Sequence, residues 1–249
     1  MRNYKMILSY DGSRYKGWQR LGKDELTIQG LLEKAISEVT SQAVEVHGSG
    51  RTDAGVHAKG QVANMKLPIL LEEDFGRKLN ENLPEDIRVQ QVVRVKNGFH
   101  SRYSAKAKWY QYYVDTREKA DVFWRKYTCH YPEKLVLESM REASRYLIGT
   151  HDFSSFTDDK TEGKDRKRTI FQIEIQETDG VIRFSYYGDG FLQHMVRIVT
   201  GTLLEVGSGL RQPSDMAMIL QKKERSYAGF MAPAKGLFLE KVEYEEEQI

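Results

Sequence analysis

The sequence predicts an α+β fold built from two related halves, each with the element order β-α-β-β-α-β. Three observations lead to this prediction. Apolar residues alternate with polar ones in several short segments, as in half-buried strands, and recur every three or four positions in segments between them. The same order of elements occurs before and after a join near residues 97–104. With 249 residues, 40% of them hydrophobic, the chain has ample material for a packed core.

The first half alternates strands and helices in a regular order. Its predicted elements are a strand over residues 4–10, a helix over 28–39, strands over 43–47 and 61–67, a helix over 72–80 and a strand over 87–95. The first and last of these strands alternate apolar and polar side chains. Thr27 is a suitable N-cap for the first helix, and the second helix must end before Pro84. The two short strands enclose a glycine-rich loop.

The second half repeats that order. Its predicted elements are a strand over residues 110–114, a helix over 136–147, strands over 171–175 and 182–186, a helix over 192–206, a short helix from Pro213 and a closing strand over 237–242. Gly149 can end the first helix, and Asp179-Gly180 is typical of a tight hairpin turn. The helix over 192–206 has the most regular apolar spacing in the chain.

The glycine-rich loop, residues 48–58, carries one arginine and one carboxylate, Arg51 and Asp53. Glycines on either side allow unusual backbone dihedrals, so Asp53 can be presented to a bulky substrate. The loop matches neither a Walker loop, because Val56-His57 stands where Lys-Ser/Thr is required, nor a dinucleotide loop, because no helix follows. An Asx-type turn with a local ion pair between Arg51 and Asp53 is the alternative, and residue types alone favour it.

A second candidate stripe lies on the regular helix near the end of the chain. His194, Arg197 and Gly201 occupy positions i, i+3 and i+7, away from the apolar face. A glycine inside such a helix costs about 1 kcal/mol relative to alanine, which indicates close approach by another element. An arginine on a mostly buried helix needs a carboxylate, and Asp53 of the other half is the natural candidate. The alternative is a surface arginine with a partner nearby in its own half, Glu205 or Asp189.

The net charge of +2 conceals segregated basic segments. Residues 1–20 carry five cations against Asp11, residues 100–126 carry seven against three carboxylates, and residues 164–168 carry four against one. The acidic tail, 240–249, has the opposite balance. The aromatic residues interleaved with the basic segments are Tyr15, Trp18, Tyr103, Trp109 and Tyr110. This combination suits a polyanion with stackable bases, although an ordinary solvated surface is an equal alternative.

Several classes of protein are excluded. The single cysteine, Cys129, rules out a disulfide framework and zinc sites with paired cysteines. The six histidines do not fall at metal-ligand spacing, so no metal site is predicted, and His151-Asp152 is interpreted as a loop or helix cap. No serine nucleophile elbow or kinase signature occurs. The chain has no long apolar run and does not begin like a signal peptide, so we expect a cytoplasmic protein.

Several short motifs along the chain resemble those of a known family. Residues 51–58, Arg-Thr-Asp-Ala-Gly-Val-His-Ala, resemble the active-site motif of the tRNA pseudouridine synthase A family. Further matching blocks follow in the family's order, at residues 10–12, 17–19, 99–105, 151–156, 168–170, 190–197 and 232–237, together with Tyr110. Each block is weak alone, but their order and spacing together favour the family over both alternatives given above for Asp53 and Arg197.

The resemblance implies an isomerase that converts uridine to pseudouridine in RNA, in the anticodon stem–loop of tRNA, without metal or other cofactor. Asp53 corresponds to the family's essential aspartate, which attacks C1′ of the ribose or removes a 2′ proton. Tyr110 corresponds to the pocket tyrosine that stacks on the base. Arg197 matches the arginine that favours the ionised carboxylate. Arg51 corresponds to a residue that intrudes where the target base flips out.

The resemblance also implies a pseudouridine synthase fold, in which two ferredoxin-like halves share a central antiparallel sheet. We expect residues 1–101 to carry the catalytic Asp loop, residues 102–249 to carry the pocket Tyr and Arg, and the active cleft to lie between them. Family members are homodimers that bind tRNA. The residues expected to bind RNA are Arg51, Arg14, Lys16, Arg20, His57, Arg102, Lys106, Lys108, Arg166 and Arg168.

Three departures from the family pattern concern the choice of target. Residues 21–25 form a short segment that lacks the usual prolines, residues 158–167 differ from the usual sequence, and Met231 replaces a polar residue. One alternative is therefore the same chemistry on ribosomal RNA. Another is a non-catalytic tandem RNA-binding module or tRNA chaperone, although the RNP1 pattern of such sheets is absent.

Overall fold

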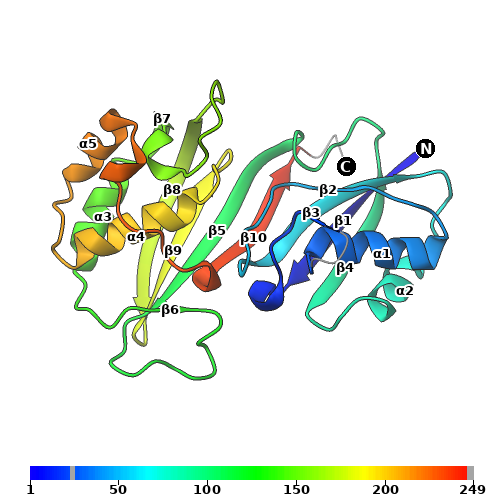
Figure 1. Ribbon diagram of the computed structural model, residues 1–249, viewed down its shortest axis with the longest axis horizontal. Helices are drawn as coiled ribbons and strands as arrows, with labels where there is room; N and C mark the ends of the chain where they lie inside the picture. The colour runs from blue at the N-terminus through cyan, green and yellow to red at the C-terminus, as the bar shows by residue number, and fades with distance from the viewer. Residues whose placement is uncertain (23–25, 246–249) are drawn as a thin grey trace. The chain divides into compact units, whose positions relative to one another are not determined.

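Two units, each with strands and helices, make up the chain in the computed structural model, which describes residues 1–22 and 26–245 (Figure 1). The first unit is Met1–Lys106 together with Phe238 and the residues that follow it, and the second is Ala107–Leu237. Helices and strands alternate in both, so the predicted α+β class is confirmed. The predicted acidic tail and the segment 21–25 each extend partly outside the described residues.

The first unit has the predicted order β-α-β-β-α-β. Its elements are β1 (Arg2–Tyr10), the 3-10 turn η1 (Gly12–Arg14), α1 (Ile28–Thr40), β2 (Val46–Gly48), β3 (His57–Leu67), α2 (Phe75–Glu81) and β4 (Ile87–Val95), and the last strand of the chain, β10 (Leu237–Tyr244), joins them. Thr27 caps α1 as predicted, because its side chain accepts a hydrogen bond from Gly30 N at 3.3 Å.

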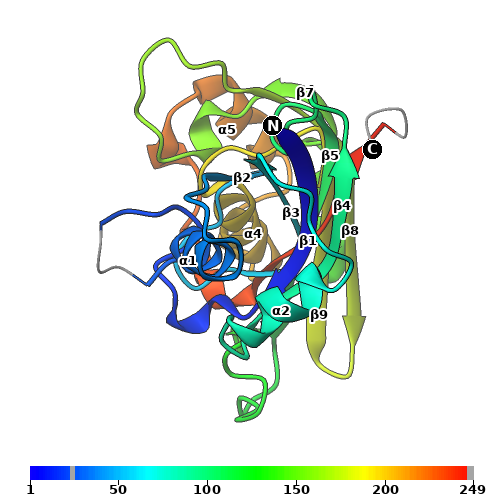
Figure 2. The same cartoon turned by 90° about the vertical axis from the view of Figure 1, so that its right-hand side faces the viewer.

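The sheet of the first unit is mostly antiparallel. Strand β1 lies between β3 and β4 and pairs antiparallel with both, and β2 also pairs antiparallel with β3. Strand β10 pairs in parallel with the start of β3, through Phe238 opposite His57 and Leu239 opposite Ala58. Helices α1 and α2 lie on the same side of β1, β3 and β4 (Figure 2). The end of the chain therefore reaches the residues that follow the Asp53 loop.

Both faces of β1 are partly covered, which differs from the half-buried strand that the alternation predicts. Tyr4, Met6 and Leu8 are buried as expected. Asn3 and Lys5, on the other face, are buried too. The side-chain amide of Asn3 donates hydrogen bonds to the backbone carbonyls of Lys96 (3.1 Å) and Phe99 (2.8 Å), which follow β4 in the sequence. A polar side chain is tolerated in such a place because its hydrogen bonds are satisfied.

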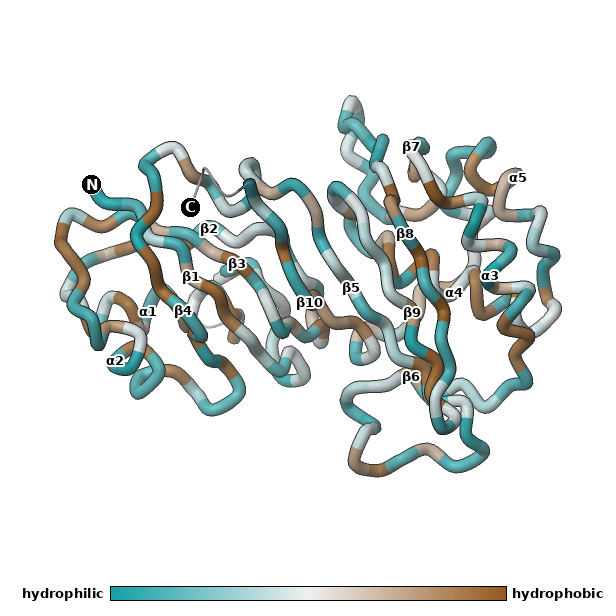
Figure 3. Tube along the Cα trace, turned by 180° about the vertical axis from the view of Figure 1, so that it is seen from behind, coloured by the Kyte–Doolittle hydropathy of each residue, from teal (hydrophilic) through white to brown (hydrophobic). Residues whose placement is uncertain are grey.

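The second unit contains an antiparallel sheet in the order β5-β9-β8-β7, and β6 pairs in parallel with β5. Its elements are β5 (Ala105–Asp115), β6 (Cys129–His130), α3 (Leu137–Arg145), β7 (Gly149–Asp152), η2 (Ser154–Phe156), β8 (Lys167–Thr178), β9 (Val181–Gly188), α4 (Met195–Gly207), α5 (Asp215–Lys222), η3 (Arg225–Tyr227) and η4 (Ala234–Gly236). Apolar segments, drawn brown, recur along the strands of both units (Figure 3).

Two local predictions in the second unit are confirmed. Asp179 (φ 51°) and Gly180 (φ 74°) both have positive φ at the turn from β8 to β9, as the tightest hairpin turns require. A Cβ on Gly201 would lie 1.9 Å from the carbonyl oxygen of Phe230, so another segment does approach α4 at this glycine. The segment that contains Phe230 can therefore lie directly on the helix.

The interpretation of His151-Asp152 as a loop or helix cap is wrong in part. Both residues lie in β7 and pair antiparallel with β8, His151 opposite Arg168 and Asp152 opposite Lys167. The strand has four residues, too few to give an alternating pattern. Asp152 also forms a local turn with the residues that follow β7, because its Oδ1 accepts hydrogen bonds from the backbone N (3.1 Å) and hydroxyl (2.6 Å) of Ser154.

Candidate active site

The loop that carries Asp53 connects β2 to β3 and is anchored where it leaves β2. The backbone N of Ser49 donates to the carbonyl of Val62 at 2.7 Å, and its hydroxyl donates to Gln61 Oε1 at 2.7 Å. Gln61 Nε2 in turn donates to the carbonyl of Gly50 at 3.1 Å. Ser49 and Gln61 are both fully buried, so these hydrogen bonds fix the start of the loop against β3.

Two further hydrogen bonds fix Thr52, the residue directly before Asp53. The hydroxyl oxygens of Thr52 and Tyr10 share a buried hydrogen bond of 2.8 Å, which ties the loop to the end of β1. The carbonyl of Thr52 accepts from the backbone N of Trp18 at 3.0 Å. Thr52 itself is buried, whereas Asp53 is half-buried. The backbone of Asp53 is therefore fixed while its side chain remains partly accessible.

Two glycines far away in the sequence make room for this loop. A Cβ on Gly12 would lie 2.0 Å from the carbonyl oxygen of Val56, and one on Gly17 would lie 2.6 Å from that of Thr52. Gly17 also has a positive φ of 90°. Any other residue at either position would push the loop away. The blocks at residues 10–12 and 17–19 thus accompany the Asp53 motif because they pack directly against it.

The structure places His57, expected among the RNA-binding residues, in the interior of the first unit. Its side chain is 1% exposed, and its Nδ1 lies 3.1 Å from both Gly12 N and Asp11 Oδ1. The ring stacks on Phe238 with a centroid distance of 4.6 Å. In this position the imidazole supports the loop from inside and joins it to β10.

Arg51 points to solvent instead of closing a local turn. Among the described residues no carboxylate forms an ion pair with it, so the alternative of a local Arg51–Asp53 pair is not observed. The backbone does turn here, because Val56 N donates to the carbonyl of Asp53 at 3.1 Å and Gly55 has a φ of 80°. The turn is thus maintained by the backbone, and the arginine remains available.

Tyr110 lies in the second unit, on β5, opposite Tyr186 of β9. It is 8% exposed and contacts the ring of Phe191. The edge of one ring meets the face of the other, and the two ring centroids are 5.2 Å apart. Such an arrangement is favourable for two aromatic rings and holds the phenol plane in one orientation.

Arg197 lies in the first turn of α4 and is 9% exposed. Its Nε donates to the carbonyl of Ala232 at 2.8 Å, and Ala232 N donates to the carbonyl of Arg197 at 3.1 Å. The approach of Phe230 to Gly201 brings Ala232 to this position. Neither partner of the surface alternative is used, because Glu205 binds Arg211 and Asp189 accepts from Thr169 N.

The remaining cations expected to bind RNA lie at or near the surface. Three of them form ion pairs, Arg14 with Asp86 (2.6 Å), Arg20 with Glu33 (2.9 Å) and Lys106 with Glu245 (2.8 Å). Arg166 and Arg168 donate to backbone carbonyls of their own segment. Lys16 and Arg102 are exposed, and Lys108 is half-buried. The pair of Lys106 is exposed at both ends and contributes little, so this cation can exchange its carboxylate for a phosphate, whereas Glu33, the partner of Arg20, is buried.

Residues 1–22 and 26–245 contain neither a metal-binding cluster nor a helix able to cross a membrane. No three His, Cys, Asp or Glu side chains of this part of the chain come together as a metal ion would require. None of its helices combines the length and apolar character needed to cross a membrane.

A family model described as tRNA pseudouridine synthase matches residues 6–104 and 143–245. The chain belongs to the tRNA pseudouridine synthase family. Asp53 and Arg197 lie inside the matched ranges, and Tyr110 lies between them. The predicted family and function are thereby confirmed: the chain is an isomerase that acts on uridine in tRNA. The matches favour neither of the two alternatives, ribosomal RNA as the substrate or a non-catalytic RNA-binding role.

Proteins of the same family cover the chain almost completely. A tRNA pseudouridine synthase A from Bacillus sp. (strain KSM-64) is 48% identical over 98% of this chain and 100% of its own length. A tRNA pseudouridine synthase A 1 from Clostridium tetani (strain Massachusetts / E88) is 46% identical over the same shares. Among solved structures, a chain in the crystal structure of a Cbf5-Nop10-Gar1 complex is 12% identical, with a TM-score of 0.38, over 81% of this chain and 45% of that chain.

Proposed function

We propose that this synthase modifies uridines in the anticodon stem–loop of tRNA and that Asp53 is its essential group. The observation that carries the proposal is the Asp53 loop within a family match that extends over most of the chain. The loop backbone is fixed by Tyr10, Gln61 and Trp18, and the carboxylate remains half-exposed. A carboxylate held in this way loses little entropy when it meets a ribose.

The reaction rearranges one nucleotide and needs no second substrate. The bond from uracil N1 to ribose C1′ breaks, the base turns, and a bond from C5 to C1′ forms. The proton on C5 leaves and N1 gains one, so the product has the same atoms as the substrate. The Asp53 carboxylate serves either by attacking C1′ or by removing a 2′ proton, and both routes require it to be ionised.

We propose that Tyr110 and Arg197 of the second unit serve the same uridine as Asp53. The ring of Tyr110 offers a surface for the base, held in orientation by Phe191. Arg197 supplies a positive charge whose position is determined by Ala232. A fixed cation stabilises a carboxylate better than a mobile one, because its interactions need no reorganisation.

The exposed cations are proposed to bind the phosphates around the target and to stabilise the flipped nucleotide. Arg51 is the nearest of them in sequence to Asp53 and has no carboxylate partner among the described residues. Flipping costs a few kcal/mol, and less in a loop than in a duplex. Phosphate contacts from Arg14, Lys16 and Arg102 can supply that energy.

We further propose a homodimer in the bacterial cytoplasm. The support is the family, whose members here are bacterial proteins named for tRNA modification, and the fact that tRNA is a cytoplasmic substrate. The free cysteine, Cys129, is buried, as suits a reducing compartment.

The test is incubation of unmodified tRNA transcripts with the purified protein, followed by carbodiimide-adduct mapping of new pseudouridines. Asp53→Asn should fold and bind tRNA but form no pseudouridine. Asp74→Asn is a matched control, because it removes another half-buried carboxylate of the same unit, at the start of α2. Pseudouridine confined to the anticodon stem–loop supports the proposal. Retained activity in Asp53→Asn, or modification only elsewhere in tRNA, overturns it.

A further inference from the structure

A pocket of about 230 Å³ lies in the first unit beside the Asp53 loop. The side chains that line it and matter here are Trp18, His47, Arg51, His100, Arg102 and Tyr103. Pockets for whole small molecules are larger, roughly 300–1,000 Å³. A volume of this size suits one part of a larger ligand, such as a single nucleotide of an RNA chain.

Three rings form a row along the pocket. The centroids of His47 and His100 are 5.2 Å apart, and those of His100 and Tyr103 are 4.4 Å apart. Tyr103 is 79% exposed, far more than is usual for a tyrosine ring. An exposed ring next to other flat groups is the arrangement on which single-stranded bases stack.

His100 has a defined hydrogen-bonding pattern. Its Nδ1 accepts a hydrogen bond from the backbone N of Arg102 at 3.1 Å, so the proton of the neutral ring is carried by Nε2. Partial burial lowers the pKa of His100, and the nearby His47 and Arg102 lower it further. The neutral ring therefore offers one N–H donor and a flat face.

The pocket has two cations without carboxylate partners. No carboxylate among the described residues forms an ion pair with Arg51 or Arg102, and both are exposed. The Arg102 guanidinium lies 5.9 Å from the centroid of Tyr103. The only acidic lining residue, Glu45, is 3.8 Å from His47 Nδ1. Unpaired arginines beside stackable rings are suited to a phosphate next to a base.

The backbone around the pocket is fixed. Ser101 is fully buried, its N donates to Asn64 Oδ1 at 2.9 Å, and its hydroxyl donates to the carbonyl of His47 at 2.5 Å. Gly48 allows Trp18 to close the floor, because a Cβ there would lie 2.5 Å from the indole. The pocket is thus formed before any ligand arrives, which lowers the entropic cost of binding.

We propose that this pocket binds one nucleotide of the RNA substrate adjacent to the target uridine, with its base on Tyr103 and His100 and its phosphate against Arg51 and Arg102. The proposal rests on the proposed function in so far as it takes RNA as the ligand. The position next to the target follows from the chain, because Arg51 is two residues from Asp53 and their Cα atoms are at most about 7 Å apart.

The test uses Asp53→Asn as the parent, so that the RNA is not modified during measurement. The probe is a fluorescent, unmodified anticodon stem–loop RNA. Adding Tyr103→Ala should weaken binding roughly 5- to 100-fold, the range expected when one stacked base loses its aromatic partner. Tyr103→Phe should restore most of the affinity, because the ring remains. Arg102→Ala should weaken binding and make it less sensitive to salt.

Arg94→Ala is the matched charge control, because Arg94 is an exposed arginine of the same unit, on β4, that does not line the pocket. Thermal unfolding checks that each variant folds. Unchanged affinity in Tyr103→Ala overturns the pocket proposal, and so does equal weakening with a blunt duplex RNA, which has no free base. If the unmutated chain makes no pseudouridine but Tyr103→Ala still weakens stem–loop binding, the proposed function fails and the pocket stands.

Discussion

The hydroxyl groups of Tyr10 and Thr52 lie 2.8 Å apart in the interior of the first unit, one residue away from Asp53. Burial raises the pKa of Tyr10 to about 12, so its hydroxyl keeps its proton throughout the neutral range. Tyr10 also accepts a hydrogen bond from Gln61 Nε2 at 3.3 Å. One phenol thereby joins β1, β3 and the loop that presents the carboxylate.

Tyr10→Phe should therefore lower both stability and activity. The change leaves the buried hydroxyl of Thr52 without this partner, which costs about 1–3 kcal/mol in the free energy of unfolding. Pseudouridine formation should fall as well, because the backbone before Asp53 becomes less restricted. Urea denaturation and single-turnover assays on a tRNA transcript measure the two effects.

Tyr4→Phe is the control for this change, because Tyr4 is another buried tyrosine of β1 whose hydroxyl donates to the carbonyl of Ile69 at 3.0 Å. It should lose similar stability and keep its activity. A double-mutant cycle of Tyr10→Phe with Thr52→Val isolates the shared bond. Equal activity losses in the Tyr4 and Tyr10 variants would contradict a special role for the Tyr10–Thr52 contact.

Most elements could be predicted because their signals are local. Thr27 caps α1 through a residue three positions away, and Asp179-Gly180 makes the hairpin through its own backbone. The short strands β6 and β7 have no such signal, since two and four residues show no period. Their positions depend on the long strands β5 and β8 beside them.

The candidate site could be predicted only in its residue types. The Asp53 motif marks the loop, but no spacing indicates that Gly12 and Gly17 pack against it. For Arg197 the sequence suggests a carboxylate partner, whereas the hydrogen bond observed within its own unit goes to a backbone carbonyl, that of Ala232. Every residue has a carbonyl, so this partner cannot be identified from side-chain chemistry.

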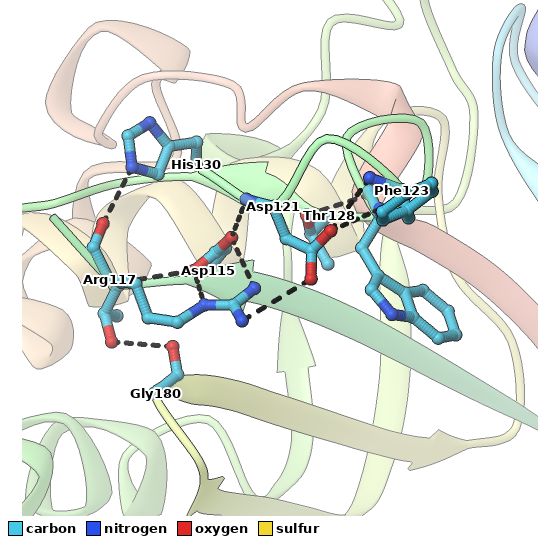
Figure 4. A network of polar contacts seen from close by, with 9 residues as sticks. Asp115, Arg117, Asp121, Phe123, Thr128, His130 and Gly180 are labelled. Carbon is cyan, nitrogen blue, oxygen red and sulfur yellow. Dashed lines mark hydrogen bonds and ion pairs between the residues drawn. The ribbon is translucent and has the colours of Figure 1, made fainter. Parts of the chain in front are cut away.

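The ion pair between Asp115 and Arg117, where the connection from β5 to β6 begins, should make stability depend on pH (Figure 4). The Asp115 side chain is 1% exposed and accepts two hydrogen bonds from Arg117, at 2.8 Å to Nε and 2.9 Å to the terminal nitrogen. These bonds, with backbone N–H groups of Asp121 and Arg117, lower the pKa of Asp115 from 3.8 to about 2. The folded state thus favours the ionised carboxylate more than the unfolded state does.

Because the folded pKa lies below the unfolded one, this stabilisation is present above about pH 4 and is lost as the pH falls toward about 2. Arg117→Ala should lower the free energy of unfolding at neutral pH, by less than the whole pKa shift of Asp115 implies because the backbone N–H groups remain, and it should have little effect at pH 2. Urea denaturation across this range measures the difference. Glu138→Gln, which alters exposed pairs on α3, should show no such dependence. A constant difference for Arg117→Ala would show that packing, not charge, stabilises the connection.

Arg197→Ala should lose stability together with activity. The substitution leaves the carbonyl of Ala232, a residue with no exposed surface, without its side-chain donor, which costs about 1–3 kcal/mol. Arg197→Lys keeps the charge but not the planar guanidinium, so it should recover only part of either property. Thermal unfolding and carbodiimide mapping of tRNA transcripts measure both.

Arg211→Ala separates catalysis from stability, because Arg211 belongs to the same unit and binds Glu205 of α4. It should lower the melting temperature while pseudouridine formation persists. A loss of about 3–5 kcal/mol in Arg197→Ala would exceed what one carbonyl can account for and would indicate that a buried carboxylate also depends on this arginine. An unchanged melting temperature in Arg197→Ala would instead mean that the hydrogen bond to Ala232 adds nothing to stability. A loss of pseudouridine formation in that variant would then be due to the missing positive charge alone.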